Sequence, residues 1–171
     1  VAKRQRFKIK DLQHACEDVT STYGSSLFPD VAIEYTIEED LLPEFIVGDW
    51  AKIQQCVVNL VSNAQKYCRG GRIGDGTTSP EKNGAMLVTV RFLMDIDHNQ
   101  LRIEVSDNGV GVNESRVRSY FKRDGTGLGS VGMIMESMGG TYGGQRNART
   151  GAAPLPLSSS SSGSMFFIAV P

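Results

Sequence analysis

A hairpin in the middle of the chain restricts the possible folds more than any other feature of the sequence. Residues 86–94 and 101–105 alternate between apolar and polar side chains, and His98-Asn99 lies between them. Two such runs joined by a short turn predict antiparallel strands. Helical patterns flank the hairpin, so we expect a mixed sheet with helices layered on one face, rather than a doubly wound fold.

The longest helical pattern begins at Asp49 and ends near Cys68. Its apolar residues recur at the spacing of one helix face: Ile53, Cys56, Val57, Leu60, Val61 and Ala64. Asp11 has the character of an N-cap for an earlier amphipathic helix that runs through Val19. Further helices are expected near residues 114–121 and 128–138.

Other segments alternate or are continuously apolar in the manner of strands. They are residues 7–9, 31–37 and 46–48, an extended segment from Thr141, and a final strand over 165–170. Residues 69–85 and 151–163 are rich in Gly, Ser, Thr or Pro and are predicted to be loops. The whole pattern predicts one α/β domain over residues 1–171, a two-layer sandwich.

Composition excludes several classes of function. The formal net charge of −1 gives no electrostatic basis for binding nucleic acid or for direct contact with an anionic membrane. The three cysteines have no CxxC spacing, which argues against a zinc site or a disulfide framework. A reducing compartment is therefore expected, either cytoplasm or an organelle stroma, and this is compatible with a membrane-bound parent protein.

Asn59, Asn63 and Lys66 are spaced to share one face of the long helix. Two carboxamides and an ammonium group suit a divalent cation with phosphates, because Mg²⁺ takes oxygen ligands and keeps phosphate oxygens around it. The alternative is a solvated polar stripe.

Asp107, Gly109 and Gly111 directly follow the second strand of the hairpin. A carboxylate held at a strand end can accept a hydrogen bond from an exocyclic amine such as that of adenine. The glycines let the backbone approach a flat ring closely. The alternative is an ordinary Asp-Asn-Gly turn.

A third segment, Gly125-Thr126-Gly127-Leu128-Gly129, leads into the helix expected over 128–138. Glycine-rich loops that open a helix present free N–H groups and a positive dipole end to phosphates. No Gly-Lys-Ser/Thr follows, so this is not a Walker motif. The alternative is a glycine hinge.

The order and spacing of these three segments resemble the GHKL superfamily, and within it the sensor histidine kinases. Residues 59–67 resemble the family's N box, 107–111 its first glycine box and 125–129 its second. The resemblance extends over essentially the whole chain. It includes Gly48-Asp49 before the N box, Met138-Gly139-Gly140-Thr141, and the terminal strand from Gly163 to Pro171.

The resemblance implies a Bergerat fold, in which about five strands of a mixed sheet carry three helices on one face. ATP would lie between the N-box helix and a mobile lid. Asp107 would bind the adenine amine, and Gly109 and Gly111 would flank the base.

The resemblance also implies which residues would contact Mg²⁺ and the phosphates of ATP. Asn63, supported by Asn59, would hold Mg²⁺, while Lys66 and Tyr67 would reach phosphate. Phosphate would also meet the backbone of the second glycine box, which comprises Gly125, Thr126, Gly127, Leu128 and Gly129. The implied activity transfers the γ-phosphoryl group of ATP to a histidine on a separate dimerisation/phosphoacceptor domain of the same parent, with a response regulator as a further partner.

One position separates the subfamilies. The hydrolytic relatives place a Glu four residues before the Mg²⁺-binding Asn, and here that residue is Asn59, which cannot act as a general base. This favours a kinase over a hydrolytic ATPase. A degenerate nucleotide-binding or docking module stays open as an alternative, because the lid over residues 112–124 is short and the second box continues with Ser130 and Gly132.

Overall fold

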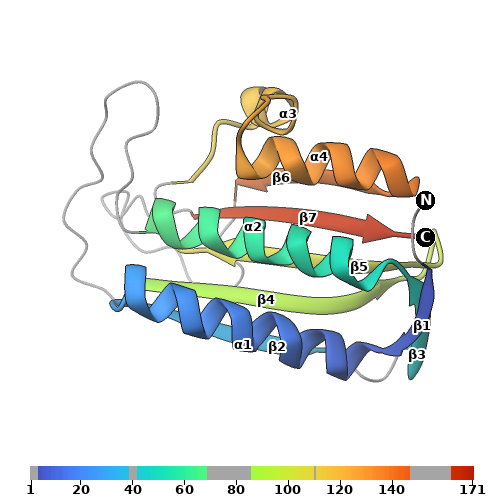
Figure 1. The fold of residues 1–171 in the computed structure, drawn as a ribbon. Coiled ribbons are helices and arrows are strands. Elements are labelled where there is room, and N and C mark those ends of the chain that lie inside the picture. The colour runs from blue at the N-terminus through green and yellow to red at the C-terminus, as the bar shows by residue number, and fades with distance from the viewer. Residues whose placement is uncertain (1–3, 39–41, 69–85, 110, 147–162) are drawn as a thin grey trace, which may run out of the picture.

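A five-stranded mixed sheet with helices on one face forms the body of the molecule (Figure 1). The computed structural model describes residues 4–38, 42–68, 86–109, 111–146 and 163–171. The sheet strands are β2 (Val31–Ile37), β4 (Met86–Asp95), β5 (Gln100–Asp107), β6 (Thr141–Arg146) and β7 (Ser164–Val170). Their order is β2-β4-β5-β7-β6, with β2 parallel to β4 and the other pairs antiparallel. The predicted α/β sandwich is confirmed.

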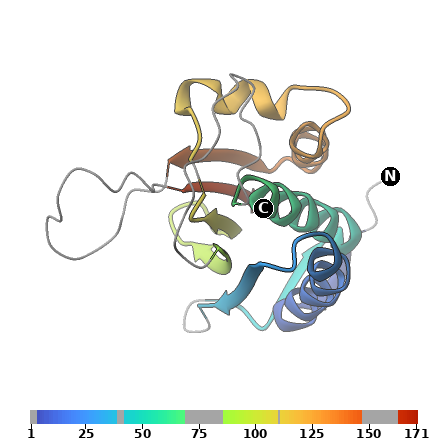
Figure 2. The ribbon, with the colours of Figure 1, turned by 90° about the vertical axis from the view of Figure 1, so that its left-hand side faces the viewer.

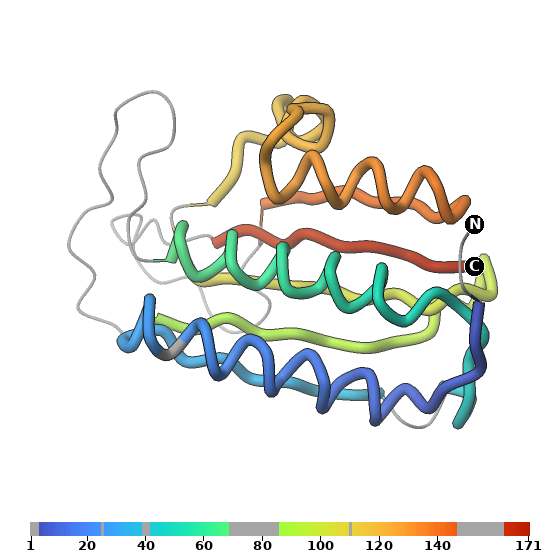
Figure 3. The backbone as a smooth tube through the Cα atoms, viewed as in Figure 1, coloured from blue at the N-terminus to red at the C-terminus, as the bar shows by residue number. Residues whose placement is uncertain are grey.

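Three long helices cover one face of this sheet, as the view along them shows (Figure 2). They are α1 (Ile9–Leu27), α2 (Trp50–Cys68) and α4 (Gly127–Met138). The backbone trace shows α2 between the other two, with α4 running in the opposite direction, so that α4 begins near the end of α2 (Figure 3). The helix predicted over 114–121 is split into a 3₁₀ turn, η1 (Glu114–Arg116), and a short helix, α3 (Val117–Phe121).

The central helix α2 has the limits that the sequence predicts. Asp49 caps it, because its Oδ1 accepts a hydrogen bond from the Lys52 N–H at 3.3 Å. The predicted apolar face is buried: Ile53, Cys56, Val57, Leu60, Val61 and Ala64. All three cysteines are free and buried, and burial raises the pKa of the Cys56 thiol to about 12.

The prediction that Asp11 caps the first helix is wrong. The strand β1 (Gln5–Lys8) pairs with β3 (Phe45–Gly48) in a separate two-stranded sheet, and α1 begins directly at Ile9. Ile9 is buried together with Leu12, on the apolar face of the helix. The helix therefore begins three residues before Leu12, where a cap at Asp11 would have started it.

Strand register brings distant segments together at one end of the sheet. In the antiparallel β5–β7 pair, Ser106 lies opposite Met165, so the end of β5 meets the beginning of β7. The hairpin turn between β4 and β5 is confirmed, with Asn99 at a positive φ of 52°. The predicted loops over 69–85 and 151–162 lie outside the described residues. Among the helices that are described, none combines the length and apolar character needed to cross a bilayer.

Candidate functional site

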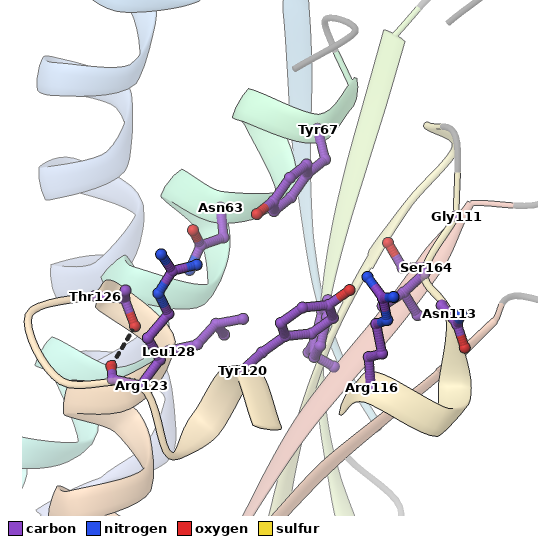
Figure 4. A pocket seen from close by; sticks show the side chains of 12 residues that line it. Asn63, Tyr67, Gly111, Asn113, Arg116, Tyr120, Arg123, Thr126, Leu128 and Ser164 are labelled. Atoms are coloured by element: carbon purple, nitrogen blue, oxygen red, sulfur yellow. Dashed lines mark hydrogen bonds between the residues drawn. The ribbon is translucent and has the colours of Figure 1, made fainter. Parts of the chain in front are cut away.

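A cavity of about 410 Å³ lies between the last turns of α2 and the segment from Gly111 to the beginning of α4 (Figure 4). The sequence predicted five of its lining residues: Asn63, Tyr67, Gly111, Thr126 and Leu128. The other seven are Val112, Asn113, Arg116, Tyr120, Arg123, Ser164 and Phe166. The cavity therefore joins the predicted N box to both predicted glycine boxes.

Asp107 lies directly behind one end of the cavity and is almost fully buried. Its Oδ2 accepts a hydrogen bond from the Ser164 hydroxyl at 2.6 Å, and its Oδ1 accepts from the Gly109 N–H at 2.7 Å. Ser164 itself lines the cavity, whereas Asp107 is not among the lining residues. The fold thus fixes the carboxylate through the first residue of β7, a partner that sequence reasoning missed.

Gly109 is required by close packing against the end of α2. A Cβ at this position would lie 2.8 Å from the Tyr67 carbonyl oxygen and 3.1 Å from the Cys68 Cα. Any larger residue would push the end of β5 away from the helix. Gly111, by contrast, has a φ of 83°, a conformation that favours glycine.

Asn108 is a second residue that sequence reasoning missed. Its Oδ1 accepts hydrogen bonds from the Leu87 N–H and the Cys68 Sγ, each at 3.0 Å. The side chain therefore joins the end of α2, the beginning of β4 and the end of β5. An Asp-Asn-Gly sequence signals a turn, but it does not indicate partners so far away along the chain.

The wall formed by α2 presents Asn63 and Tyr67 to the cavity (Figure 4). The Nδ2 of Asn63 is buried and has no hydrogen-bond partner among the described residues. Burial raises the pKa of the Tyr67 hydroxyl, while the positive charge of Arg123 opposes that rise. Lys66 is exposed and is not among the lining residues, so its predicted contact with phosphate stays a prediction.

The beginning of α4 forms the opposite wall, with Thr126 as its N-cap. The Thr126 Oγ1 accepts from the Gly129 N–H at 3.0 Å and donates to the Arg123 carbonyl oxygen at 2.8 Å (Figure 4). A Cβ on Gly129 would overlap that same carbonyl oxygen, so glycine is needed for the α3–α4 connection to pack on the helix. The Gly129 N–H is thus engaged within the cap.

Gly125 and Gly127 complete the second glycine box. Gly125 has a φ of 71°, and a Cβ on Gly127 would lie 3.2 Å from the Nδ2 of Asn63 and 3.8 Å from the Cβ of Asn59. The start of α4 therefore packs against the N-box helix at the two predicted asparagines. Asn59 lies outside the cavity lining, and its predicted support of Mg²⁺ stays a prediction.

Two arginines and a tyrosine of the predicted lid, residues 112–124, supply polar groups to which sequence reasoning gave no individual role. Arg116, Tyr120 and Arg123 line the cavity from η1, α3 and the connection to α4 (Figure 4). Within the described part of the chain, no salt bridge engages either guanidinium group. The cavity is therefore lined by positive charge that the described residues leave uncompensated.

The side chains that line the cavity suit a metal ion that arrives bound to a phosphate ligand, rather than one held by protein side chains alone. No three His, Cys, Asp or Glu side chains among the described residues gather so that they could hold a metal. Mg²⁺ accepts amide oxygens and completes its shell with phosphate and water oxygens. Asn63 and Asn113 both line the cavity, but the Asn113 Oδ1 already accepts two hydrogen bonds from Ser115. The Asn63 carboxamide is therefore the group that would hold Mg²⁺ here.

Comparison with known proteins identifies the family. Residues 48–171 match the family model described as Histidine kinase-, DNA gyrase B-, and HSP90-like ATPase. The chain belongs to this family. The predicted resemblance to sensor histidine kinases within it is confirmed: Sensor histidine kinase GacS of Pseudomonas protegens is 32% identical over 118 residues, which is 59% of this chain and 11% of GacS.

Solved structures share the family fold. The mycobacterial sensor histidine kinase MprB aligns with a TM-score of 0.68 at 18% identity, covering 98% of this chain and 97% of the MprB chain. Full-length ShkA in complex with AMPPNP aligns with a TM-score of 0.71 at 20% identity, covering 100% of this chain and 31% of ShkA. The chain therefore has the fold of histidine kinase catalytic domains, and it corresponds to a small part of GacS.

Proposed function

We propose that this family member binds Mg-ATP in the cavity and transfers the γ-phosphoryl group to a histidine on a separate dimerisation domain of the same parent protein. The observation that carries the proposal is that the two ends of one cavity differ in how their polar groups are paired. A hydrogen-bonded carboxylate lies behind one end, and an unpartnered amide and a guanidinium lie at the other. The cavity volume of about 410 Å³ falls in the range of small-ligand sites.

The end next to Ser164 suits the adenine base. Asp107 only accepts hydrogen bonds, and its contacts with Ser164 and Gly109 fix its orientation. An exocyclic amine that reaches this carboxylate would therefore find a pre-oriented hydrogen-bond acceptor. Access to the carboxylate lies along Ser164, which lines the cavity. ShkA, which shares the fold, is known in complex with AMPPNP, an analogue of ATP.

The end formed by Asn63, Arg123 and the start of α4 suits the phosphates. The guanidinium of Arg123 provides charge-assisted hydrogen bonds, and the N-terminus of α4 adds its positive dipole end. When bound, Mg²⁺ would neutralise charge on the transferring phosphoryl group, and Asn63 would hold it there. Positioning and charge neutralisation account for most of the catalysis of such transfers.

The site supports transfer to a protein nucleophile better than hydrolysis. None of the described residues that line the cavity is Asp or Glu, and the position of the hydrolytic Glu is occupied by Asn59. Water at the γ-phosphate would therefore meet no carboxylate base. His14 and His98 are not among the lining residues either, so the acceptor imidazole comes from another segment, from which a response regulator would take the phosphoryl group.

The test is incubation of the chain with γ-labelled ATP, alone and together with the parent protein's phosphoacceptor segment. We expect an acid-labile label on the added segment, no autophosphorylation of the chain alone and only slow phosphate release. Rapid phosphate release by the isolated chain would instead identify a hydrolytic ATPase. Nucleotide binding without transfer to the segment would identify a degenerate binding module.

A further inference from the structure

The two arginines that line the cavity come from different ends of it. In Figure 4, Arg123 lies on the side of Asn63 and Thr126, whereas Arg116 lies on the side of Ser164 and Gly111. The guanidinium of Arg123 lies beside Asn63, near the last turns of α2 (Figure 4). The two cations therefore face different parts of any ligand that spans the cavity.

The backbone that carries Arg116 is held on both sides. Asn113 caps η1, since its Oδ1 accepts from the Ser115 N–H at 3.1 Å and from the Ser115 hydroxyl at 2.7 Å. Glu114 ties the same turn to β6, because its Oε1 accepts from the Arg146 N–H at 2.9 Å. Val117, the residue after Arg116, is buried.

These contacts fix the position of the Arg116 Cα while its side chain stays available. No salt bridge among the described residues engages its guanidinium group, which borders the cavity. A planar guanidinium stacks on the face of an aromatic ring, and such contacts with nucleobases are sequence-tolerant and stabilising.

We propose that Arg116 is a nucleotide-binding residue whose guanidinium lies against the face of the nucleobase, while Arg123 contacts the phosphates. This inference rests on the proposed function, because it assumes that the base occupies the end next to Asp107 and Ser164. It divides the positive charge of the cavity between the two halves of the nucleotide. Arg116 then covers the outer side of a base whose edge meets Asp107.

The experiment measures the affinity of adenosine, ADP and AMPPNP for the wild-type chain and for Arg116→Ala and Arg123→Ala. We expect Arg116→Ala to weaken all three ligands by the same factor, about fivefold to tenfold, as for the loss of one cation stacked on a ring. Arg123→Ala should leave adenosine unchanged and weaken ADP and then AMPPNP progressively.

Two further variants serve as controls for the position of the arginine and for its planar group. Arg118→Ala removes another exposed arginine, from α3, that does not line the cavity, and it should change none of the three affinities. Arg116→Lys keeps the charge but loses the planar group, so it should recover only part of the affinity. Thermal unfolding of each variant checks that the fold is intact.

The inference is overturned if the effect of Arg116→Ala grows from adenosine to AMPPNP, which would make Arg116 a phosphate ligand. It is also overturned if Arg116→Ala changes no affinity. Failure of the proposed function would look different, because the wild-type chain itself would then bind none of the three ligands.

Discussion

The two ends of the cavity are built in opposite ways. At the base end, Asp107 and Asn108 are held by hydrogen bonds from β7, β4 and the end of α2. At the phosphate end, the amide nitrogen of Asn63 is buried without a partner among the described residues, and no described residue forms a salt bridge with Arg123. The side chains of Asp107 and Asn108 are thus paired within the described part of the fold, whereas the Asn63 amide nitrogen and the Arg123 guanidinium are not.

In this chain, the groups that stabilise the fold are therefore distinct from those that are unpaired among the described residues. Buried polar groups that are paired stabilise the native state, whereas an unpaired one costs the desolvation of that group. Substitutions that remove a hydrogen-bonded or closely packed group at the base end should therefore damage both the fold and nucleotide binding. Those at the phosphate end should damage binding or transfer while leaving stability unchanged or improved.

Gly109→Ala should give the largest effect. The new Cβ would lie 2.8 Å from the Tyr67 carbonyl oxygen, so the end of β5 and the last turn of α2 must separate. We expect the free energy of unfolding to fall by about 1–3 kcal/mol, typical of overpacking, and AMPPNP binding to be lost. Chemical denaturation and calorimetry measure the two quantities.

Gly139→Asn is the matched control for Gly109→Ala. Gly139 ends α4 with a φ of 70° and has no heavy atom within 4 Å of its Cβ position, and asparagine tolerates this conformation. The control should keep both stability and binding. Wild-type behaviour of Gly109→Ala would show that the packing between β5 and α2 is not needed for the site.

Asp107→Asn should weaken AMPPNP binding by about 1.5–3 kcal/mol, the range for a hydrogen bond to a charged group. The fold should survive, because the Asn Oδ1 can still accept from the Gly109 N–H and the Asn Nδ2 can donate to the Ser164 hydroxyl. Calorimetry together with circular dichroism makes the comparison. An unchanged affinity would mean that the adenine amine does not meet Asp107.

Asn108→Ala should lower the free energy of unfolding by about 1–3 kcal/mol, because the Leu87 N–H would lose its side-chain acceptor. Binding should weaken as well, since Asn108 holds the end of β5, where Asp107 lies. The measurement is urea denaturation monitored by circular dichroism. A variant as stable as the wild-type chain would contradict the view that the base end is supported by its own hydrogen bonds.

Asn63→Ala should give the smallest change in stability and a specific change in binding. Removing a buried amide nitrogen that lacks a partner, at a helical position where alanine is preferred, should leave the unfolding free energy unchanged or raise it. Affinity for AMPPNP should no longer increase when Mg²⁺ replaces a chelator. Retention of the metal enhancement would place the Mg²⁺ ligand elsewhere.

The fold could be predicted from the sequence because its signals are local. The helix from Asp49 to Cys68 follows from an apolar face and a capping carboxylate, and the hairpin follows from alternation around Asn99. Asp11 misled the prediction because burial of Ile9 outweighs the capping preference.

The same reasoning predicted only some of the residues that line the candidate site. Spacing on one helix face predicted Asn63, which lines the cavity, together with Asn59 and Lys66, which do not. Tyr67 was implied by the family resemblance. Ser164 and Arg116 reach the cavity through strand register and through the path of η1, which depend on long-range packing. Their contribution could not be read from neighbouring residues.

The most direct test of the account is a calorimetric titration of the wild-type chain with AMPPNP, once with Mg²⁺ and once with a chelator. We predict saturable binding that is tighter with Mg²⁺, because Asn63 and the phosphates would share the metal. Absence of binding under both conditions would contradict the account, since neither the carboxylate behind Ser164 nor the unpartnered groups at the other end would then serve a nucleotide.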